Sequence, residues 1–400
     1  MPVELEISSV AYRGSGISRP DGIVTFVPRT LPGERVLAEV VSVRKNFQVA
    51  RLIEVLRPSP DRIDSECLLP DGTPVPGCAY DFAKYEAEVA IKDGQLRDFL
   101  RRFNLPESTF LPPFASPAPL HYRNKATFHV RGGMHFAAGY FGDDNRTVID
   151  IPSCPLSSPE INAAWADIRK SLQASPARCP ATVTLRHTEK DGVVSWTDET
   201  PPQPGRRLVE HSPAGDLLVP CDGFYQINPF VSGALVEQVR DWIAEIAAGG
   251  NIDLALDLFC GVGPFALAAA RLGIGRVVGV ETSRPSIKCA RLNAERLSIP
   301  AAEFHCRDAA RFLADNTSSL PLDRAVVIAD PPRSGFQREA IDALCASPLH
   351  HAIFVSCDPA TLARDLAIAV SAGFAIDKVR LFDMFPRTIH FETAVLLSRH

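Results

Sequence analysis

The chain lacks an excess of positive charge, because its 400 residues carry a formal net charge of −5 at pH 7. Nucleic-acid binding would therefore have to rest on local basic patches, since phosphate attraction acts within about one Debye length. The start, MPVELEISSV, lacks the basic flank and apolar run of a signal peptide. The most apolar window, residues 252–270, contains two aspartates and two glycines, which excludes a membrane span.

A disulfide framework is also not expected. Ten cysteines are spread over the chain without an export signal, which predicts reduced thiols, a metal site or catalysis. Apolar residues make up 46% and charged residues 22% of the chain, which is a soluble globular profile. The length suits two or three domains with a sizeable core. We therefore expect a cytoplasmic protein without a membrane partner, and nothing implies an obligate protein partner.

The first half of the chain consists of short apolar runs between turn residues. Residues 1–57 have the pattern of a small closed β-barrel, and eight Arg and Lys against six Asp and Glu make this part mildly basic. Residues 58–79 form a linker rich in Pro and Asp. Residues 80–115 begin with a helical pattern that Asn104-Leu105-Pro106 ends. Residues 116–220 contain five strand candidates among Pro and Gly turns, which predicts a β-rich central domain.

From residue 221 to residue 400 the pattern changes to alternating strands and helices. Helical segments separate the first five of seven strand candidates, which predicts βαβ crossovers and a doubly wound parallel sheet of the α/β class. The strand candidates are DLALDLF, RVVGVE, AEFHCRD, RAVVIAD, HAIFVSC, DKVRLFDMF and FETAVLLSR.

A glycine-rich turn follows the first of these strands in the segment DLFCGVGPFA. Gly261 and Gly263 let the backbone approach a ligand, and Pro264 suits the first turn of a helix. Glu281 ends the next strand, where a carboxylate can accept both ribose hydroxyls. The pattern fits S-adenosylmethionine, but also a nicotinamide dinucleotide (G-x-G-x-x-A with an acid 20 residues after Gly261) or a turn without a ligand.

Asp330-Pro331-Pro332-Arg333 follows the fourth strand of the same series. The two prolines fix the backbone, so that Asp330 is presented rigidly at the carboxyl edge of the sheet. An aromatic residue after the prolines would indicate methylation of an exocyclic amine. Arg333 stands there instead, which argues against that reaction. A capping aspartate in a rigid loop is the alternative interpretation.

A thiol and a carboxylate stand near the end of the chain. Cys357 directly precedes Asp358-Pro359, a helix N-cap followed by proline at the first helical position. The positive end of that helix would favour the thiolate, which is the nucleophilic form. Glu392 stands in an apolar strand and is either a structurally paired carboxylate or a general base. An inert core cysteine is the alternative for Cys357.

Taken together, these motifs resemble the S-adenosylmethionine-dependent RNA uracil-5 methyltransferases, which make 5-methyluridine in ribosomal or transfer RNA. The resemblance covers nearly the whole chain. Residues 1–57 are similar to the TRAM domain, an oligonucleotide-binding-like barrel. The motifs that stand in the order of the family are Phe224-Tyr225-Gln226-Ile227-Asn228, DLFCGVG, DPPRSG, VSCDPATLARD and FPRTIHFETAVLLSR.

The resemblance implies a class I methyltransferase fold, S-adenosylmethionine as methyl donor and RNA as partner. Cys357 would be the nucleophile that adds to C6 of uracil, and Glu392 the base that removes the C5 proton. Asp330 would lie between cofactor and target base, and Phe224 would stack on RNA. The cofactor site would comprise Gln226, Phe259, Gly261, Gly263, Glu281 and Asp308.

One departure from the family concerns the cofactor. Pro264 stands where many relatives carry Asn, and this removes one side-chain contact to S-adenosylmethionine.

A second departure concerns an iron–sulfur cluster. Relatives with a four-iron four-sulfur cluster hold it with four cysteines, and Cys67, Cys78 and Cys154 match three of these. Val75 stands where the Cys-Gly-Gly-Cys motif would begin. The sequence therefore leaves three possibilities open: a cluster with Asp71 as substitute ligand, a cluster with an external ligand, or unconnected thiols.

The TRAM-like residues and the cysteines favour 23S ribosomal RNA over transfer RNA, since the bacterial transfer-RNA branch usually lacks both. The target nucleotide should lie in a loop or be flipped out, because thiol and methyl donor must both reach the ring. Three alternatives stay open: an RNA cytosine-5 methyltransferase with the same thiol, a nicotinamide-dependent oxidoreductase, and a non-catalytic RNA-binding protein.

Overall fold

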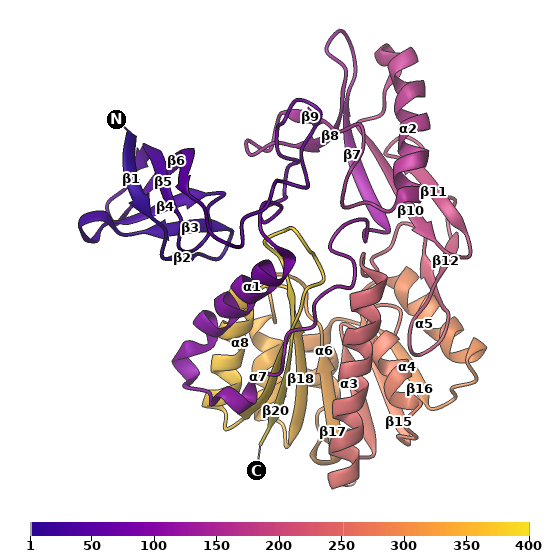
Figure 1. The fold of residues 1–400 in the computed structure, drawn as a ribbon. Helices are drawn as coiled ribbons and strands as arrows, with labels where there is room; N and C mark the ends of the chain where they lie inside the picture. Colours follow the sequence, from indigo (N-terminus) through magenta and orange to yellow (C-terminus); the bar gives the residue numbers. More distant parts are fainter. Residues whose placement is uncertain (1, 251, 400) are drawn as a thin grey trace.

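The computed structural model describes residues 2–250 and 252–399. The chain forms an N-terminal β domain, a central β-rich domain and a C-terminal α/β domain (Figure 1). In that view the N-terminal domain lies to one side of the other two and is connected to them by an extended segment. Within the described residues, no helix combines the length and hydropathy needed to cross a membrane.

The N-terminal domain is a single curled sheet of six strands in the order β1-β5-β6-β4-β3-β2. Its core contains six buried apolar side chains: Leu5, Ile7, Val27, Val36, Ala38 and Ala50. The described pairings leave β1 and β2 at the two ends of the sheet, so the closed barrel stays a prediction. The strands are β1 Pro2–Glu6, β2 Ser9–Val10, β3 Ser15–Ser18, β4 Val24–Pro28, β5 Arg35–Val43 and β6 Phe47–Arg57.

Helix α1, Tyr85–Leu100, follows the linker and begins five residues later than the sequence pattern predicts. A short 3-10 turn continues it to Phe103, and Asn104 adopts a left-handed conformation with φ of 49°. This agrees with the predicted helix end at Asn104-Leu105-Pro106. The 3-10 turns of the chain are Pro20–Gly22, Arg101–Phe103, Glu107–Thr109, Pro176–Arg178 and Leu322–Arg324.

The central domain confirms the five predicted strands, which pair in the order β11-β10-β7-β8-β9. Helix α2, Pro159–Ala174, was not predicted, although Ser158 accepts a hydrogen bond from Ile161 N as a regular N-cap. Trp165 of this helix stacks on Phe128 with ring centroids 3.9 Å apart. The strands are β7 Lys125–Arg131, β8 Ala137–Phe141, β9 Val148–Asp150, β10 Thr182–Thr188, β11 Gly192–Thr197 and the separate pair β12 Arg207–Glu210 and β13 Leu217–Pro220.

The C-terminal domain confirms the predicted α/β class. Its seven strands lie in the order β16-β15-β14-β17-β18-β20-β19. The first five are parallel, whereas β20 runs antiparallel to both β18 and β19. The elements are α3 Pro229–Gly249, β14 Leu254–Leu258, α4 Pro264–Ala270, β15 Arg276–Glu281, α5 Arg284–Arg296, β16 Ala302–Cys306, α6 Ala309–Asn316, β17 Ala325–Ala329, α7 Arg338–Ala346, β18 His351–Ser356, α8 Pro359–Ser371, β19 Ala375–Phe382 and β20 Glu392–Ser398.

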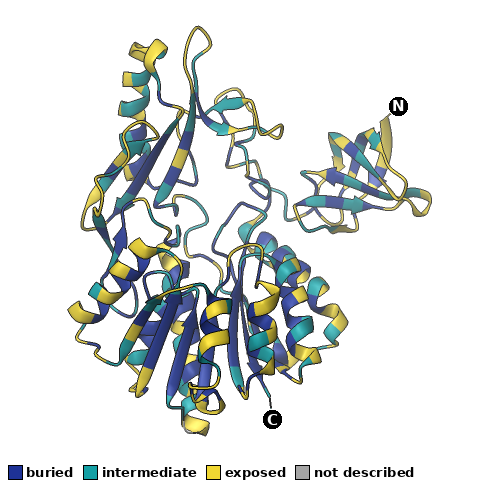
Figure 2. Ribbon diagram, turned by 180° about the vertical axis from the view of Figure 1, so that it is seen from behind, coloured by how far each residue is buried: buried dark blue, intermediate teal, exposed yellow. Residues whose placement is uncertain are grey.

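Helices cover both faces of this sheet, which explains why its strands are nearly continuous apolar runs (Figure 2). Helices α3, α4 and α5 pack on one face. Helices α6, α7 and α8 pack on the other face, where α1 joins them through Leu96 and Leu100. The helix that precedes the central domain in sequence is therefore part of the C-terminal layer structure.

Candidate active site

The predicted site residues of the C-terminal domain gather at one edge of its sheet. Because parallel strands end at the same edge, the segments after β14, β15, β16, β17 and β18 come together there. These segments carry the glycine-rich turn and the side chains of Glu281, Asp308, Asp330 and Cys357. The antiparallel strand β20 begins at the same edge, with Glu392 as its first residue.

The glycine-rich turn after β14 has an unusual backbone. Phe259, Gly261 and Gly263 have φ of 64°, 55° and 90°, which explains the glycines and makes Phe259 a strained position. A Cβ on Gly261 would meet no heavy atom within 4 Å, so the turn faces open space. The Gly261 amide donates to Glu281 Oε2 over 3.3 Å, which joins the turn to the end of β15. Helix α4 begins at Pro264 as predicted.

Asp257, the fourth residue of strand β14, is hydrogen-bonded to the start of the helix that follows this turn. Its carboxylate accepts the Ala266 amide over 2.9 Å, while its other oxygen, Oδ1, has no hydrogen-bond partner among the described residues. Burial raises the pKa of Asp257 well above its usual value. The side chain therefore supports the helix start, and its position inside the core excludes direct access to solvent.

The β18–β20 ladder ends where Cys357 and Glu392 begin. The last pairs of this antiparallel ladder are Val355 with Ala394 and Ser356 with Thr393. The next residue on each strand is Cys357 on one side and Glu392 on the other. The negative charge of Glu392 acts on the Cys357 thiol, which shows that the two side chains are near each other. Cys357 and Glu392 are 35 positions apart in the sequence. In the fold they lie at the same end of the sheet.

Glu392 is a buried carboxyl group, with 4% of its surface exposed. Its Oε2 atom has no hydrogen-bond partner within the described part of the chain. Burial raises the pKa of Glu392 well above its usual value, the negative charge of Asp330 raises it further, and Arg333 lowers it. Burial also raises the pKa of Asp330 to about 7. A carboxylate with a raised pKa is a stronger base, so Glu392 suits proton abstraction.

That the helix end favours the Cys357 thiolate stays a prediction, and burial and a neighbouring carboxylate act in the opposite direction. The cap itself forms as predicted, because Asp358 accepts the amides of Ala360 and Thr361 over 3.0 and 2.9 Å. Burial nevertheless raises the pKa of the Cys357 thiol to about 12, and the charge of Glu392 raises it as well. Desolvation and a neighbouring carboxylate therefore disfavour the thiolate in the free enzyme.

Arg333 is the cation that favours the thiolate, since its charge lowers the pKa of Cys357. The loop that carries it is tied to helix α8. Thr361 Oγ1 donates to the Arg333 carbonyl over 3.3 Å, and the Phe336 amide donates to Asp365 over 3.0 Å. Gly335 has φ of 74°, and a Cβ there would lie 2.5 Å from Asp365 Oδ2. The motifs DPPRSG and SCDPATLARD therefore form one rigid unit.

A buried ion network fixes the segment that leads into Glu392. Lys92 of α1 donates to Glu88 Oε1 and to Asp383 Oδ1, both over 2.7 Å, and all three side chains are fully buried. The Arg387 amide donates to Glu88 over 2.7 Å, and its guanidinium donates to the Ala83 carbonyl over 2.8 Å. Removing one partner from such a network leaves a buried charge uncompensated. The network therefore holds residues 383–391 in one conformation.

The remaining predicted residues lie around this edge with fewer contacts. Asp308 is the N-cap of α6 and accepts the Arg311 amide over 3.1 Å. Gln226 is half-buried and Phe224 is 73% exposed, in the segment between β13 and α3. Asn228 caps α3, and its amide nitrogen donates to the Met384 carbonyl over 3.3 Å. That bond connects the segment to the loop before Glu392.

The three cysteines outside this domain lie together in the core of the central domain. Cys67, Cys78 and Cys154 are buried in one apolar cluster with Val75. Hydrogen bonding to Cys67 and burial raise the pKa of the Cys78 thiol far above its usual value, and the nearby Cys154 raises it further. Asp71 is exposed, and its carboxylate accepts the Thr73 amide over 2.9 Å.

These residues do not fit a four-iron four-sulfur cluster. Val75 is 2% exposed, so an isopropyl group fills the place that the family pattern gives to a fourth thiolate. Asp71 caps a turn at the surface, which excludes it as the substitute ligand in this conformation. Across the described ranges, 2–250 and 252–399, no group of three or more His, Cys, Asp or Glu side chains is arranged to hold a metal ion.

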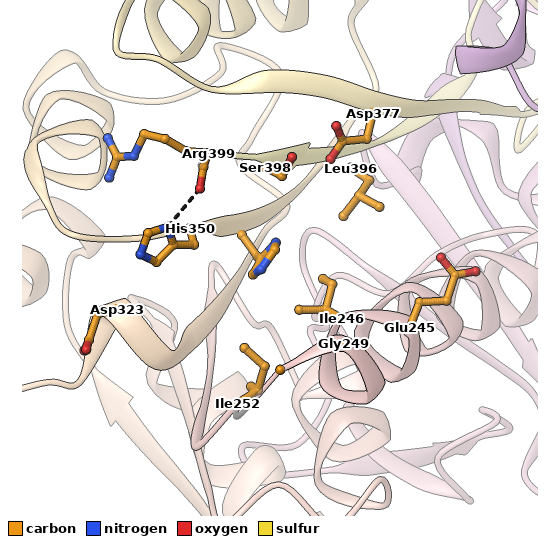
Figure 3. A pocket seen from close by; sticks show the side chains of 12 residues that line it. Glu245, Ile246, Gly249, Ile252, Asp323, His350, Asp377, Leu396, Ser398 and Arg399 are labelled. Atoms are coloured by element: carbon orange, nitrogen blue, oxygen red, sulfur yellow. Dashed lines mark hydrogen bonds between the residues drawn. The ribbon is translucent and has the colours of Figure 1, made fainter.

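A large hollow lies at the opposite edge of the sheet. Its volume is about 770 Å³, and His350, Asp377 and Arg399 are among the residues that line it (Figure 3). Ile252 and His351, which also line it, are at the starting ends of β14 and β18. Ligands of open α/β sheets bind at the carboxyl ends of the strands, so this hollow lies away from the chemistry.

Sequence reasoning missed two features of the site. At the level of the sequence, Arg333 serves only as evidence against amine methylation. Its position directly after the two prolines at the carboxyl edge could have indicated a cation in the site. Tyr12 reaches Asp358 from the N-terminal domain, with its hydroxyl donating to Oδ2 over 3.4 Å. No local pattern can predict that contact, because 346 residues separate the two side chains.

Comparisons with known proteins place the chain in a family. Residues 221–400 match the family described as tRNA (uracil-5-)-methyltransferase. An uncharacterised RNA methyltransferase of Thermosynechococcus vestitus is 30% identical to this chain. The alignment covers 99% of this chain and 98% of that protein. The 23S rRNA (uracil(1939)-C(5))-methyltransferase RlmD of Alcanivorax borkumensis is 27% identical over 100% of this chain and 97% of its own length.

A solved structure has the same fold over almost the whole chain. The tRNA (uracil-54, C5)-methyltransferase of Pyrococcus abyssi, in complex with S-adenosyl-L-homocysteine, superposes with a TM-score of 0.75. The identity is 22%, and the alignment covers 99% of this chain and 100% of the other. This likeness extends beyond the C-terminal domain to the N-terminal and central domains.

Proposed function

Because the chain belongs to the S-adenosylmethionine-dependent RNA uracil-5 methyltransferase family, we propose that Cys357 is its nucleophile and Glu392 its base. The protein is an enzyme that methylates C5 of uracil in RNA, with S-adenosylmethionine as the methyl donor. The observation that carries the residue assignment is the β18–β20 register, in which Cys357 follows Ser356 and Glu392 precedes Thr393.

The chemistry explains why a thiol is needed. Uracil C5 is a poor nucleophile, and addition of the Cys357 thiolate to C6 makes C5 an enolate carbon. The new S–C6 bond takes the electron pair of the thiolate, and the C5–C6 double-bond pair moves toward C5 and O4. S-adenosylmethionine, when bound, supplies the electrophilic methyl group that C5 takes up.

Release of the product requires a base. After methylation, C5 carries both the methyl group and its original proton. Glu392 removes that proton, the C5–C6 double bond forms again, and the S–C6 bond breaks to return the thiolate. The raised pKa of Glu392 supports this assignment, because burial and the charge of Asp330 make it a stronger base than a solvated carboxylate.

The turn after β14 fits an adenosine-containing methyl donor. Gly261 leaves open space at the backbone, and Glu281 lies within hydrogen-bond distance of that turn, where its carboxylate can meet the ribose hydroxyls. Asp330 would lie between the donor and the target base. The residues that we assign to the cofactor are Gln226, Phe259, Gly261, Gly263, Glu281, Asp308 and Asp330.

RNA is the partner of the enzyme, and the exposed Phe224 is the side chain that we assign to base stacking. We assign residues 1–57 to a TRAM-like RNA-binding domain, residues 58–79 to a linker and residues 80–115 to a helix on the catalytic domain. Residues 116–220 would be the central domain and residues 221–400 the catalytic domain. The likeness over 99% of the chain to a solved methyltransferase supports this arrangement.

The target that we propose is a uridine of 23S rRNA. Two relatives that carry the name RlmD, from Shewanella woodyi and Alcanivorax borkumensis, align over 99% and 100% of this chain at 26% and 27% identity. The test is methylation of separate 23S rRNA and tRNA transcripts with labelled S-adenosylmethionine, followed by nucleoside mapping. Label in 5-methyluridine of 23S rRNA is the expected result. Label confined to tRNA, or found in 5-methylcytidine, would contradict the target.

A further inference from the structure

Tyr12, in the turn between β2 and β3 of the N-terminal domain, contacts the proposed active site. Its hydroxyl donates to Asp358 Oδ2 over 3.4 Å. Its ring meets Phe391 edge to face, with ring centroids 6.3 Å apart, and meets Phe99 of α1 in the same way at 5.3 Å. The Tyr12 side chain thus connects the N-terminal domain to the carboxyl edge of the C-terminal sheet.

Two of these contacts, with Asp358 and with Phe391, involve a direct chain neighbour of a reacting group. Asp358 follows Cys357, and Phe391 precedes Glu392. The β18–β20 ladder ends one pair earlier, at Ser356 and Thr393, so no further β pairing within that ladder holds the two reacting residues together. Tyr12 bridges the two strand ends at the point where the ladder stops.

The Asp358 carboxylate divides its two oxygens between two tasks. Oδ1 accepts the amides of Ala360 and Thr361 and so caps helix α8. Oδ2 accepts the Tyr12 hydroxyl. With the helix cap alone, only Oδ1 is bonded and the carboxylate can rotate about that atom. The hydrogen bond from Tyr12 to Oδ2 fixes the plane of the carboxylate. The backbone between Cys357 and α8 is thereby restrained from the side of the N-terminal domain.

The turn that carries Tyr12 is itself held in place. The Gln95 amide nitrogen donates to the carbonyls of Ala11 and Val10 over 2.9 and 3.3 Å. Gly14, with φ of 86°, lies so close to its neighbours that a Cβ would stand 3.2 Å from Ala79 Cβ and 3.4 Å from an Ile389 methyl group. The turn is therefore seated on α1 and on the segment that leads into Glu392.

We propose that Tyr12 is a positioning residue for methyl transfer, which holds Cys357 and Glu392 face to face through Asp358 and Phe391. This inference rests on the roles proposed above for those two residues. It gives the N-terminal domain a part in catalysis in addition to RNA binding. The two reacting groups keep their productive geometry only while the β2–β3 turn is seated.

The test is single-turnover methylation of the target RNA at saturating RNA by the full-length enzyme. Tyr12→Phe keeps the ring and removes only the hydroxyl. We expect its rate to fall by about fivefold to twentyfold, because a small loss of alignment at the reacting atoms has a large effect on rate. The RNA concentration at half-saturation and the melting temperature should stay unchanged. Tyr140→Phe, which removes a buried hydroxyl of the central domain, is the matched control and should keep the wild-type rate.

A double-mutant cycle then tests the proposed route through Asp358. Asp358→Ser keeps a good N-cap residue, but its single side-chain oxygen caps the helix and leaves no second atom for the Tyr12 hydroxyl. If Tyr12 acts through Asp358, Tyr12→Phe should have no further effect in the Asp358→Ser background. Rate losses that multiply in the double variant would overturn the route.

The outcomes separate this inference from the proposed function. A wild-type enzyme that methylates RNA, needs Cys357 and is unchanged by Tyr12→Phe overturns the role of Tyr12 alone. Methylation that persists in Cys357→Ala overturns the proposed nucleophile and, with it, the positioning role. A change in RNA affinity with an unchanged single-turnover rate would show that Tyr12 contributes to RNA binding instead and overturns the inference.

Discussion

Two groups of cysteines in this chain lie in different surroundings. Cys67, Cys78 and Cys154 are 0%, 6% and 0% exposed and lie among apolar side chains of the central domain. Cys357 is half-buried at the carboxyl edge of a parallel sheet, beside Glu392, Asp330 and Arg333. The three central-domain thiols are packed in a core, whereas Cys357 lies among ionisable side chains.

The comparison shows that burial alone does not separate a reactive thiol from an inert one. Hydrogen bonding to Cys67 and burial raise the pKa of Cys78, and burial raises the pKa of Cys357. What distinguishes Cys357 is its position at the end of a strand, a nearby carboxylate and a cation that lowers the pKa of the thiol. The core thiols lie in an apolar cluster in which Val75 stands in the place of a fourth sulfur, and Arg123 and Tyr140 lie near Cys154.

Substitution of Cys357 should abolish activity, whereas substitution of a cysteine away from the carboxyl edge should leave activity unchanged. Cys357→Ala should lower methyl transfer at least about a thousandfold, because no other group can supply the electron pair that adds to C6. Cys179→Ala, at a half-exposed cysteine of the central domain, is the matched control and should keep the wild-type rate. The measurement is incorporation of labelled methyl groups into RNA. A Cys357→Ala enzyme within tenfold of wild type would contradict the assignment.

Alkylation of the native protein should also separate the two groups. Iodoacetamide should modify Cys357, which is half-buried, at least about a hundredfold faster than the three core thiols, which are fully or almost fully buried. Peptide mapping after timed quenching gives the rate at each site. Equal rates at Cys357 and Cys154 would show that the edge is no more accessible than the core.

The pH dependence of that alkylation tests the influence of Glu392. The pKa of Cys357 is about 12, so the alkylation rate of the free enzyme should still be rising with pH at pH 9. Glu392 raises this pKa through its negative charge, and its removal therefore lowers the pKa. Glu392→Gln should speed alkylation at pH 9 roughly tenfold. A slower rate in the variant would contradict this sign.

Truncation in the thiol core should affect stability and not chemistry. Cys154→Ala removes a fully buried sulfur and should lower the free energy of unfolding by about 1–2 kcal/mol. The single-turnover rate of the folded enzyme should remain that of wild type. Denaturant unfolding and the methylation assay, on the same preparation, provide both values. Loss of activity at full stability would give this thiol a functional role.

Reconstitution with iron and sulfide should leave the wild-type protein without a cluster. The described residues offer three thiols and a buried valine, which do not fit four-coordinate thiolate ligation. Anaerobic reconstitution, followed by desalting and visible spectroscopy, is the measurement, with Val75→Cys as the comparator that restores a fourth thiol. A stable cluster spectrum in the wild-type protein would overturn this conclusion.

Much of the C-terminal domain could be predicted from local sequence. Strand and helix periods alternate there, and Pro264, Asp358 and Pro359 mark the helix starts by their backbone chemistry. The carboxyl-edge position of Glu281 and Asp330 follows from parallel topology. These features depend on neighbours within a few residues, which a single sequence contains.

Other parts of the site depend on contacts between distant segments. The insertion of β20 between β18 and β19, which brings Glu392 near Cys357, is a property of the sheet and not of either segment. The net pKa of Cys357 depends on burial and on two carboxylates from different strand ends, Glu392 and Asp330. Tyr12 reaches the site from a domain whose local pattern describes only a β structure.

The central claim, a covalent bond between Cys357 and C6 of an RNA uracil, is tested most directly with RNA that contains 5-fluorouridine at the target position. Fluorine replaces the proton that Glu392 would remove, so the methylated adduct should stall with the S–C6 bond intact. Mass spectrometry of the digested complex should find the nucleotide on the peptide that contains Cys357. Complete methylation of this RNA by an enzyme that forms no adduct, or an adduct on another residue, would contradict the account.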